Sequence, residues 1–150
     1  MPRRIRAAWA VMAALTCVSA LGPSSASGQS AAYHIVVNAA NPTTALAVKE
    51  ASDLFLGKAA RWADGAAVKP VDQSTVSPVR ATFTREVHGK KVDAIVNYWQ
   101  QMIFSGRGVP PPAKANDQDV LAYVKAYPGG IGYVSPDAPL AGVKVIVLKP

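Results

Sequence analysis

The stretch Gln73-Ser-Thr-Val-Ser-Pro-Val-Arg-Ala-Thr-Phe83 joins a polar loop to the start of a helix. Ser77 is a favoured N-cap residue, and Pro78 suits the first helical position, where its missing N–H costs nothing. Apolar residues recur at i, i+4 and i+8 from Val79, and Gly89 ends the helix. Because a helix N-terminus attracts anions, this loop is either an oxyanion cradle or only a well-capped helix start.

Strand and helix patterns alternate before this loop. Residues 33–38 form a short β-branched run that predicts a buried strand. Residues 48–56 carry a helical apolar stripe that closes at Gly57, a natural left-handed C-cap. Residues 68–71 predict a second strand that leads directly into the loop.

The same alternation continues after the loop. A second helix is predicted over residues 93–104, and a Gly- and Pro-rich loop follows over residues 105–112. A third helix begins after Asn116 and stops before Pro128, and residues 131–134 and 143–148 predict the final strands. Strands that read as buried on both faces, alternating with helices, predict one α/β domain with a parallel or mixed sheet flanked by helices.

The N-terminus has the layout of a secretory signal peptide. Three arginines at positions 3, 4 and 6 precede an apolar run over residues 7–21, and small residues follow to Gly28. We therefore expect a signal peptide over residues 1–28, export to the periplasm, and a mature domain over residues 29–150. The single cysteine, Cys17, lies within the apolar run, so the mature domain has neither a disulfide nor a thiolate metal site.

The charge excludes one class of partner. Setting aside the three arginines of the signal peptide leaves 13 basic and 9 acidic residues, a net charge of about +4. The basic residues are scattered, and Lys90-Lys91 is the only adjacent pair after the signal peptide. We therefore expect no nucleic-acid partner.

Three segments together resemble the phosphate-binding proteins of high-affinity phosphate ABC transporters. Asp53-Leu-Phe-Leu-Gly-Lys-Ala-Ala-Arg-Trp62 resembles the family's "DIFLGK…W" element, and Pro128-Gly-Gly-Ile-Gly-Tyr-Val134 is similar to its "PGSIGYV" strand entry. Residues 71–83 lie where that family carries its phosphate loop. The resemblance covers about residues 33–147 and implies one lobe of a type II periplasmic-binding-protein fold, standing alone.

The resemblance also implies a function and a set of ligand residues. It implies an exported protein that binds phosphate or another oxyanion, and the loop's departures from the family pattern imply that this binding is weakened or altered. The family loop reads approximately Arg-Ser-Asp-Gly-Ser-Gly-Thr, and residues 73–79 align with it without gaps. Ser74 and Ser77 keep both serines, Gln73 replaces the arginine, and both glycines and the threonine are lost.

The candidate ligand-binding residues are Gln73, Ser74, Thr75, Ser77 and Arg80. Ser77 either caps the helix or contacts the ligand. A cation in the first helical turn is disfavoured by about 0.3–1 kcal/mol unless an anion lies beside it. Arg80 therefore either replaces the lost arginine or bends back into solvent.

Other residues carry weaker signals. His88 is expected to interact with the dipole at the C-terminal end of its helix, and His34 has no partner that would suit a zinc site. Trp62, Tyr98 and Trp99 are expected to belong to the core rather than to a binding platform.

We expect no metal, no cofactor and no enzymatic activity, because no catalytic constellation is recognisable. Two alternatives to simple oxyanion binding stay open. One is an interaction module that has lost its ligand and docks on a membrane transporter, a sensor or an envelope protein. The other is a homodimer in which two lobes rebuild a cleft.

Overall fold

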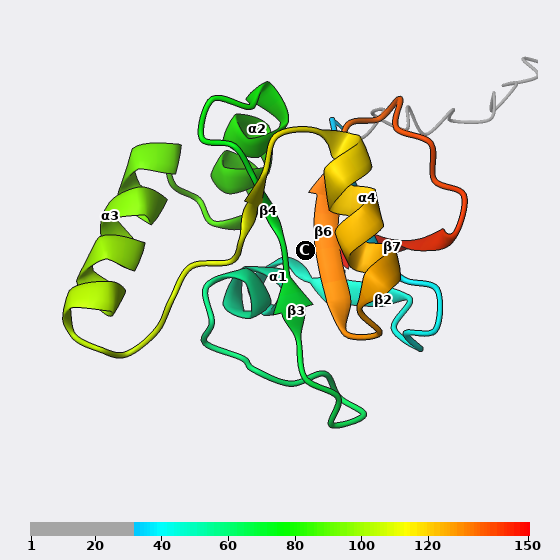
Figure 1. The fold of residues 1–150 in the computed structure, drawn as a ribbon, viewed down its shortest axis with the longest axis horizontal. Helices are drawn as coiled ribbons and strands as arrows, with labels where there is room; N and C mark the ends of the chain where they lie inside the picture. The colour runs from blue at the N-terminus through cyan, green and yellow to red at the C-terminus, as the bar shows by residue number, and fades with distance from the viewer. Residues whose placement is uncertain (1–31) are drawn as a thin grey trace, which may run out of the picture.

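The computed structural model describes residues 32–150, and the predicted signal peptide lies outside the described residues (Figure 1). The signal peptide and the start of the mature domain at residue 29 therefore stay predictions. The elements follow in the order β1 (His34–Asn38), β2 (Ala45–Ala47), α1 (Val48–Phe55), β3 (Lys69–Pro70), β4 (Asp72–Gln73), α2 (Pro78–Val87), α3 (Val92–Phe104), β5 (Ala113–Lys114), α4 (Asp117–Ala126), β6 (Gly130–Val134) and β7 (Val143–Lys149).

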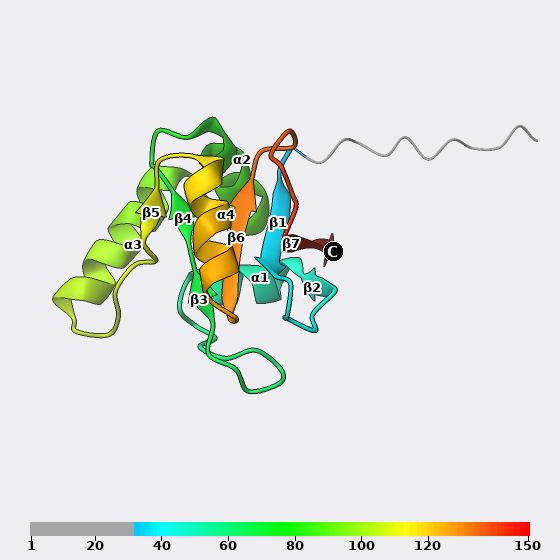
Figure 2. The ribbon, with the colours of Figure 1, turned by 45° about the vertical axis from the view of Figure 1, so that its right-hand side comes forward.

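The main sheet has five strands in the order β2-β7-β1-β6-β3. The strand β1 is antiparallel to both β6 and β7, whereas β2 runs parallel to β7 and β3 runs parallel to β6. A separate two-stranded parallel sheet joins β4 to β5, which lie side by side in Figure 2. The predicted α/β domain with a mixed sheet flanked by helices is confirmed.

Helices cover both faces of the sheet. In β1, Ile35 and Val37 belong to a core that α1 and α2 share, whereas Val36 points to the opposite face and packs with α4. Figure 1 shows α4 in front of β6 and α1 behind the sheet. The alternation of side chains along one strand therefore builds two cores, one on each face.

An aromatic stack forms the centre of the core beneath α1 and α2. The ring of Phe83 in α2 lies parallel to the ring of Tyr133 in β6, with centroids 3.9 Å apart and an interplanar angle of 8°. Phe55 in α1 meets Phe83 edge-on at 4.9 Å. The apolar i, i+4 stripe that predicted α2 is therefore the face of the helix that packs on the core, with Phe83 in this stack.

The glycines of the segment that begins at Pro128 are required by close packing. A Cβ on Gly129 would lie 1.9 Å from the carbonyl oxygen of Ala67. A Cβ on Gly132 would lie 2.7 Å from Val120 and 2.8 Å from Val71, so glycine is what lets α4 and the chain before β4 approach β6. This segment therefore positions β6, whose Tyr133 bonds to Asp72 and Gln73.

Two sequence expectations need correction or addition. The strand β7 was expected to be buried on both faces, but Val145 and Val147 are 39% and 62% exposed, because α4 packs mainly over β1 and β6. The short strands β2, β4 and β5 were not foreseen as separate strands. Trp62 and Trp99 are buried, which confirms that they belong to the core.

The helix α3 stands apart from the sheet at the left of Figure 1. It is held by a small cluster of Leu56, Ile95 and Trp99, and the hydroxyl of Tyr98 donates to the carbonyl of Leu56 at 2.8 Å. Its C-terminal end leaves Ile103 and Phe104 50% and 87% exposed.

Candidate functional site

Residues 74–77 form a tight turn between β4 and α2. The N–H of Ser77 donates to the carbonyl of Ser74 at 2.9 Å, and the N–H of Ser74 donates to the carbonyl of Lys114 at 2.8 Å. The hydroxyl of Ser77 accepts from the N–H of Arg80 at 3.3 Å, which confirms Ser77 as the N-cap. The turn is thus fixed to β5 on one side and to α2 on the other.

Both polar atoms of the Gln73 side chain form hydrogen bonds within the protein. This residue is only 3% exposed. Its Nε2 donates to the carboxylate of Asp117 and to the carbonyl of Tyr133, both at 2.9 Å. Its Oε1 accepts from the hydroxyl of Ser77 at 2.7 Å. The donors and the acceptor of this amide are therefore used by the protein itself.

Arg80 is buried, with 5% of its surface exposed, so the expectation that it bends back into solvent is wrong. Its guanidinium turns back toward the loop, where Nη2 lies 3.0 Å from a carboxylate oxygen of Asp72. Its Nη1 donates to the carbonyl of Gln73. An acidic side chain therefore lies where a cation in the first turn of α2 requires a negative charge.

Tyr133 completes the cluster around this ion pair. Its hydroxyl donates to the second carboxylate oxygen of Asp72 and accepts from the N–H of Gln73 at 3.2 Å. Burial raises the pKa of Asp72, and the Arg80 guanidinium and the tyrosine hydroxyl oppose that rise. Burial and the Asp72 carboxylate raise the pKa of Tyr133 far above its usual range, so this tyrosine stays protonated.

Asp117 ties the start of α4 to the same cluster. Its carboxylate accepts from the Gln73 amide, from the N–H of Ser135 at 3.2 Å, and from the Ser135 hydroxyl. The loop, the end of β6 and the N-terminus of α4 are therefore joined through one carboxylate.

The remaining polar groups of the turn are open. Within residues 32–150, the N–H groups of Thr75, Val76 and Val79 donate to no protein acceptor, and the hydroxyls of Ser74 and Thr75 have no side-chain partner. Thr75 is exposed and Val76 is 88% exposed. The turn therefore offers three backbone donors and two hydroxyls to solvent beside a helix N-terminus.

The predicted site residues thus fall into two groups. Ser74 and Thr75 keep free groups, whereas the polar atoms of Gln73 and Ser77 are engaged within the protein. The guanidinium of Arg80 is paired at both terminal nitrogens, and its buried Nε has no partner in the described part of the chain. Contact between any of these residues and a ligand stays a prediction.

Sequence reasoning missed the three residues that hold this arrangement: Asp72, Asp117 and Tyr133. Asp72 directly precedes the candidate residues and lies eight residues before the misplaced Arg80, and this acid was the one signal that could have indicated an internal ion pair. Asp117 and Tyr133 lie 44 and 60 residues beyond Gln73, so only the fold brings them to the loop.

His88 does not act as a charged partner of the helix dipole. Its Nδ1 lies 2.8 Å from the hydroxyl of Ser52, and its ring meets Phe83 edge-on at 5.4 Å. Burial, with smaller effects from the charges of Arg80 and Lys58, lowers its pKa to about 4. The imidazole is therefore neutral at neutral pH, and the expected ion–dipole role is wrong.

Two further features concern residues 32–150 only. No group of three or more His, Cys, Asp or Glu side chains in this part of the chain is arranged to hold a metal ion. None of its helices is long and apolar enough to cross a membrane.

Comparison with known proteins gives matches in structure alone. No protein-family model matches the sequence, and no curated protein matches it. The fold is similar to a phosphate ABC transporter substrate-binding protein of Clostridium perfringens, solved with bound phosphate, at a TM-score of 0.64 and 18% identity over 78% of this chain and 44% of that one.

Two other solved structures, both phosphate-binding proteins, have a similar fold. An ABC-type phosphate transport receptor of Vibrio cholerae has a TM-score of 0.62 and 19% identity, and the match covers 78% of this chain and 46% of the receptor. PstS of Borrelia burgdorferi has a TM-score of 0.61 and 11% identity, and the match covers 79% of this chain and 47% of PstS.

The chain therefore has the fold of a partial lobe of a type II periplasmic binding protein. More particularly, the resemblance to the phosphate-binding proteins of ABC transporters is confirmed at the level of the fold. The chain spans less than half the length of these three structures.

We expect Arg80→Ala to lower the free energy of unfolding by about 3–5 kcal/mol, because it leaves the Asp72 carboxylate buried without its partner. Urea unfolding followed by circular dichroism measures this loss. Arg85→Ala removes an exposed arginine of the same helix and should change the free energy by less than about 0.5 kcal/mol. Equal effects of the two substitutions would contradict a structural role for the ion pair.

We expect His88 to make the protein less stable in acid. The pKa of its imidazole is about 4 in the folded state and about 6.5 in the unfolded chain, so its contribution is present above about pH 6.5. That contribution is lost as the pH falls toward 4, because the unfolded chain then binds a proton that the folded protein rejects. The urea midpoint of His88→Gln should therefore fall less steeply between about pH 7 and about pH 4 than that of the unaltered chain. Identical slopes would contradict a buried neutral histidine.

Proposed function

We propose that this chain is an exported, periplasmic relative of the binding components of phosphate ABC transporters, and that it binds a small oxyanion weakly at the turn of residues 74–77. It acts as a binding protein and not as an enzyme. The fold shared with phosphate-binding proteins supports the class of function. The observation that carries the site is the set of unpaired N–H groups at Thr75, Val76 and Val79.

These groups suit an oxyanion because several donors without a protein acceptor lie at one helix N-terminus. Backbone N–H groups and hydroxyls hydrogen-bond phosphate and sulfate oxygens, and the positive end of the helix dipole adds attraction. The hydroxyls of Ser74 and Thr75 lie in the same turn. Gln73, Ser77 and Arg80 contribute to binding indirectly. Their hydrogen bonds hold the backbone of the turn in the conformation that presents its N–H groups.

Binding is weak because the strongest cation of the site is already neutralised. The Asp72 carboxylate holds the Arg80 guanidinium at 3.0 Å, and this guanidinium is out of solvent. Pro78 also removes one backbone donor from the first helical turn. We therefore expect dissociation constants of about a millimolar, equivalent to a binding free energy of about −4 kcal/mol.

Titration of the full chain with phosphate, sulfate or molybdate tests this function. We expect the amide resonances of Thr75, Val76 and Val79 to shift in NMR spectra, with saturation at millimolar concentration. A Ser74→Ala/Thr75→Ala variant should bind about tenfold more weakly, because it loses two hydroxyl donors. Thr82→Ala removes a hydroxyl that bonds within α2 and should leave binding unchanged.

Oxyanion binding at this turn would be overturned if none of these three amides shifted at up to about 50 mM of each anion. At that concentration even a site with a dissociation constant above about 1 mM is partly occupied. Equal weakening by the double variant and by Thr82→Ala would contradict the assignment of the hydroxyls.

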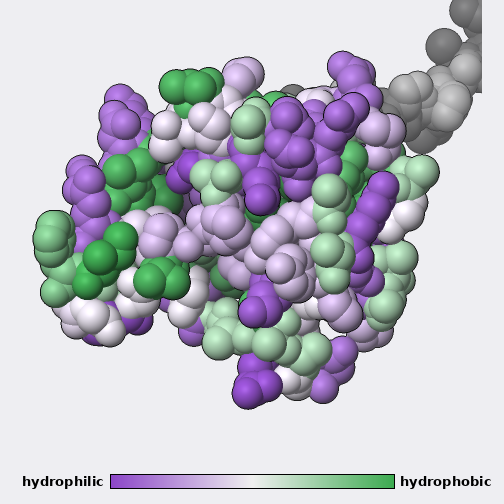
Figure 3. All heavy atoms as spheres, in the orientation of Figure 1, coloured by the Kyte–Doolittle hydropathy of each residue, from purple (hydrophilic) through white to green (hydrophobic). Residues whose placement is uncertain are grey.

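A second candidate function rests on the outer end of α3. Ile103, Phe104 and Val109 are 50%, 87% and 78% exposed, and Figure 3 shows apolar side chains gathered over this helix. Exposed apolar patches mark interaction sites, so this surface favours an adaptor that docks on a membrane transporter or sensor. Photo-crosslinking from position 104 in cells should then capture a membrane-embedded protein. Crosslinks only to a second copy, with a dimer in light scattering, would instead indicate the homodimer.

A further inference from the structure

A cavity of about 550 Å³ is lined by no residue of the turn 74–77. It opens between the entry to β2, one face of α1 and the loop of residues 59–63. Three other cavities of the described part measure about 290, 330 and 350 Å³. A volume of 550 Å³ is within the range of sites that bind small organic molecules, which is roughly 300–1,000 Å³.

The floor of this cavity is formed by apolar side chains of the core. Leu46, Leu54 and Ala59 line it and also pack against the core beneath α1 and α2. Trp62 lies beside them, and its indole Nε1 donates to the carbonyl of Gly129 at 3.1 Å. This hydrogen bond orients the ring, and the floor offers apolar surface to a ligand.

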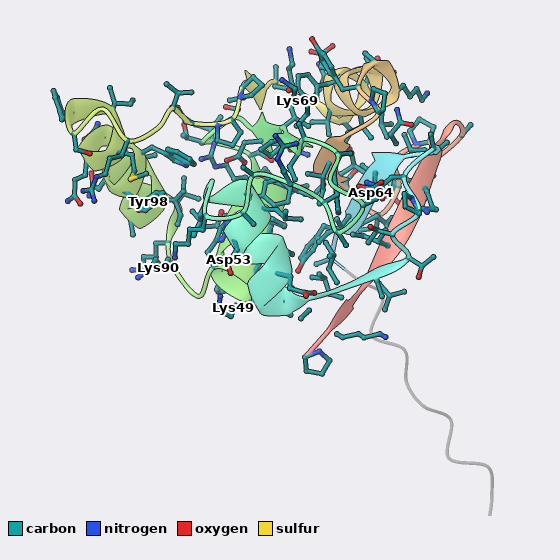
Figure 4. All side chains as sticks on the ribbon, turned by 90° about the horizontal axis from the view of Figure 1, so that it is seen from below. Lys49, Asp53, Asp64, Lys69, Lys90 and Tyr98 are labelled. Carbon is teal, nitrogen blue, oxygen red and sulfur yellow. The ribbon has the colours of Figure 1, made fainter. Side chains whose placement is uncertain are left out.

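Two carboxylates line the wall that α1 contributes. Glu50 and Asp53 are three residues apart, so they lie on the same side of the helix, where Figure 4 shows Asp53 and its neighbour Lys49. One oxygen of Glu50 accepts from the N–H of Ala47 at 2.8 Å, and one oxygen of Asp53 pairs with Lys49. Each carboxylate keeps a second oxygen without a partner in the described residues, and each can accept from a ligand.

One guanidinium also lines the cavity, from the loop of residues 59–63. Arg61 lines the cavity and uses Nη1 to donate to the carbonyl of Gly65 at 2.9 Å. The charged side chains of the lining are therefore two acids and one base. Lys49 pairs with Asp53 beside the lining, so what the cavity offers over its apolar floor is the free carboxylate oxygens of Glu50 and Asp53 as acceptors. The turn of residues 74–77 offers donors instead.

We propose that this cavity binds a small organic amine: an ammonium group held by Glu50 and Asp53, on an apolar body that packs against Leu46, Leu54 and Trp62. Charge-assisted hydrogen bonds from the ammonium to two carboxylates orient the ligand. The apolar floor takes the rest of its surface. The site is independent of oxyanion binding, because no residue of the turn lines the cavity.

Three probes that share one apolar body and differ in charge test this site: phenethylamine, phenylalanine and 3-phenylpropionate. Each is titrated into the full chain while the indole N–H resonance of Trp62 is followed by NMR. Trp99 lines another cavity, and its indole serves as the internal control. We expect the amine to shift the Trp62 signal with a dissociation constant at least about tenfold lower than that of the anion.

A Glu50→Gln/Asp53→Asn variant should weaken binding of the amine about tenfold or more, since it removes both charges but keeps an oxygen that can accept from the N–H of Ala47. Asp137→Asn removes one charge outside the lining and should leave the affinity unchanged. Circular dichroism establishes that each variant is folded. Equal affinity for all three probes, preference for the anion, or unchanged amine binding by the double variant would overturn the proposal.

Discussion

The buried ion pair between Arg80 and Asp72 is the interaction on which the loop and its surroundings depend. It neutralises a cation in the first turn of α2, where the helix dipole disfavours one. It also places the Asp72 carboxylate within reach of the Tyr133 hydroxyl, and Tyr133 stacks on Phe83 in the core. The conformation of an exposed turn is thereby coupled to the packing of the sheet.

The fold is shared with phosphate-binding proteins, and the hydrogen bonds of its loop run mainly within the protein. Gln73 stands where the family resemblance places an arginine, and its amide serves Asp117, Tyr133 and Ser77. The polar side chains of the loop are directed mainly inward. The backbone donors at Thr75, Val76 and Val79 are the groups that remain free for an anion in the described part of the chain.

Local signals in the sequence were sufficient for most of the fold. Ser77 and Pro78 fixed the start of α2, and the left-handed Gly57 fixed the end of α1. The strands β4 and β5 have two residues each, which is too short for any periodic pattern, so they could not be predicted. The exposure of Val147 in β7 depends on which strands α4 covers, and the β-branched sequence of a strand does not indicate which strands a helix will cover.

The site was less predictable than the fold because its contacts join distant parts of the chain. The sequence identified Arg80 as out of place but not its partner, and the prediction for His88 failed because burial by Phe55 and Phe83 is a tertiary property. The cavity beside α1 had no sequence signal at all, since Glu50 and Asp53 read as ordinary charges on an amphipathic helix.

Phosphate-dependent stabilisation of Asp72→Asn, compared with the unaltered chain, tests most directly whether Asp72 occupies the place of an anion. The substitution frees the Arg80 guanidinium, and phosphate can then take the position of the lost carboxylate charge. We expect millimolar phosphate to raise the melting temperature of Asp72→Asn clearly more than that of the unaltered chain. An equal or smaller rise in the variant would contradict the account.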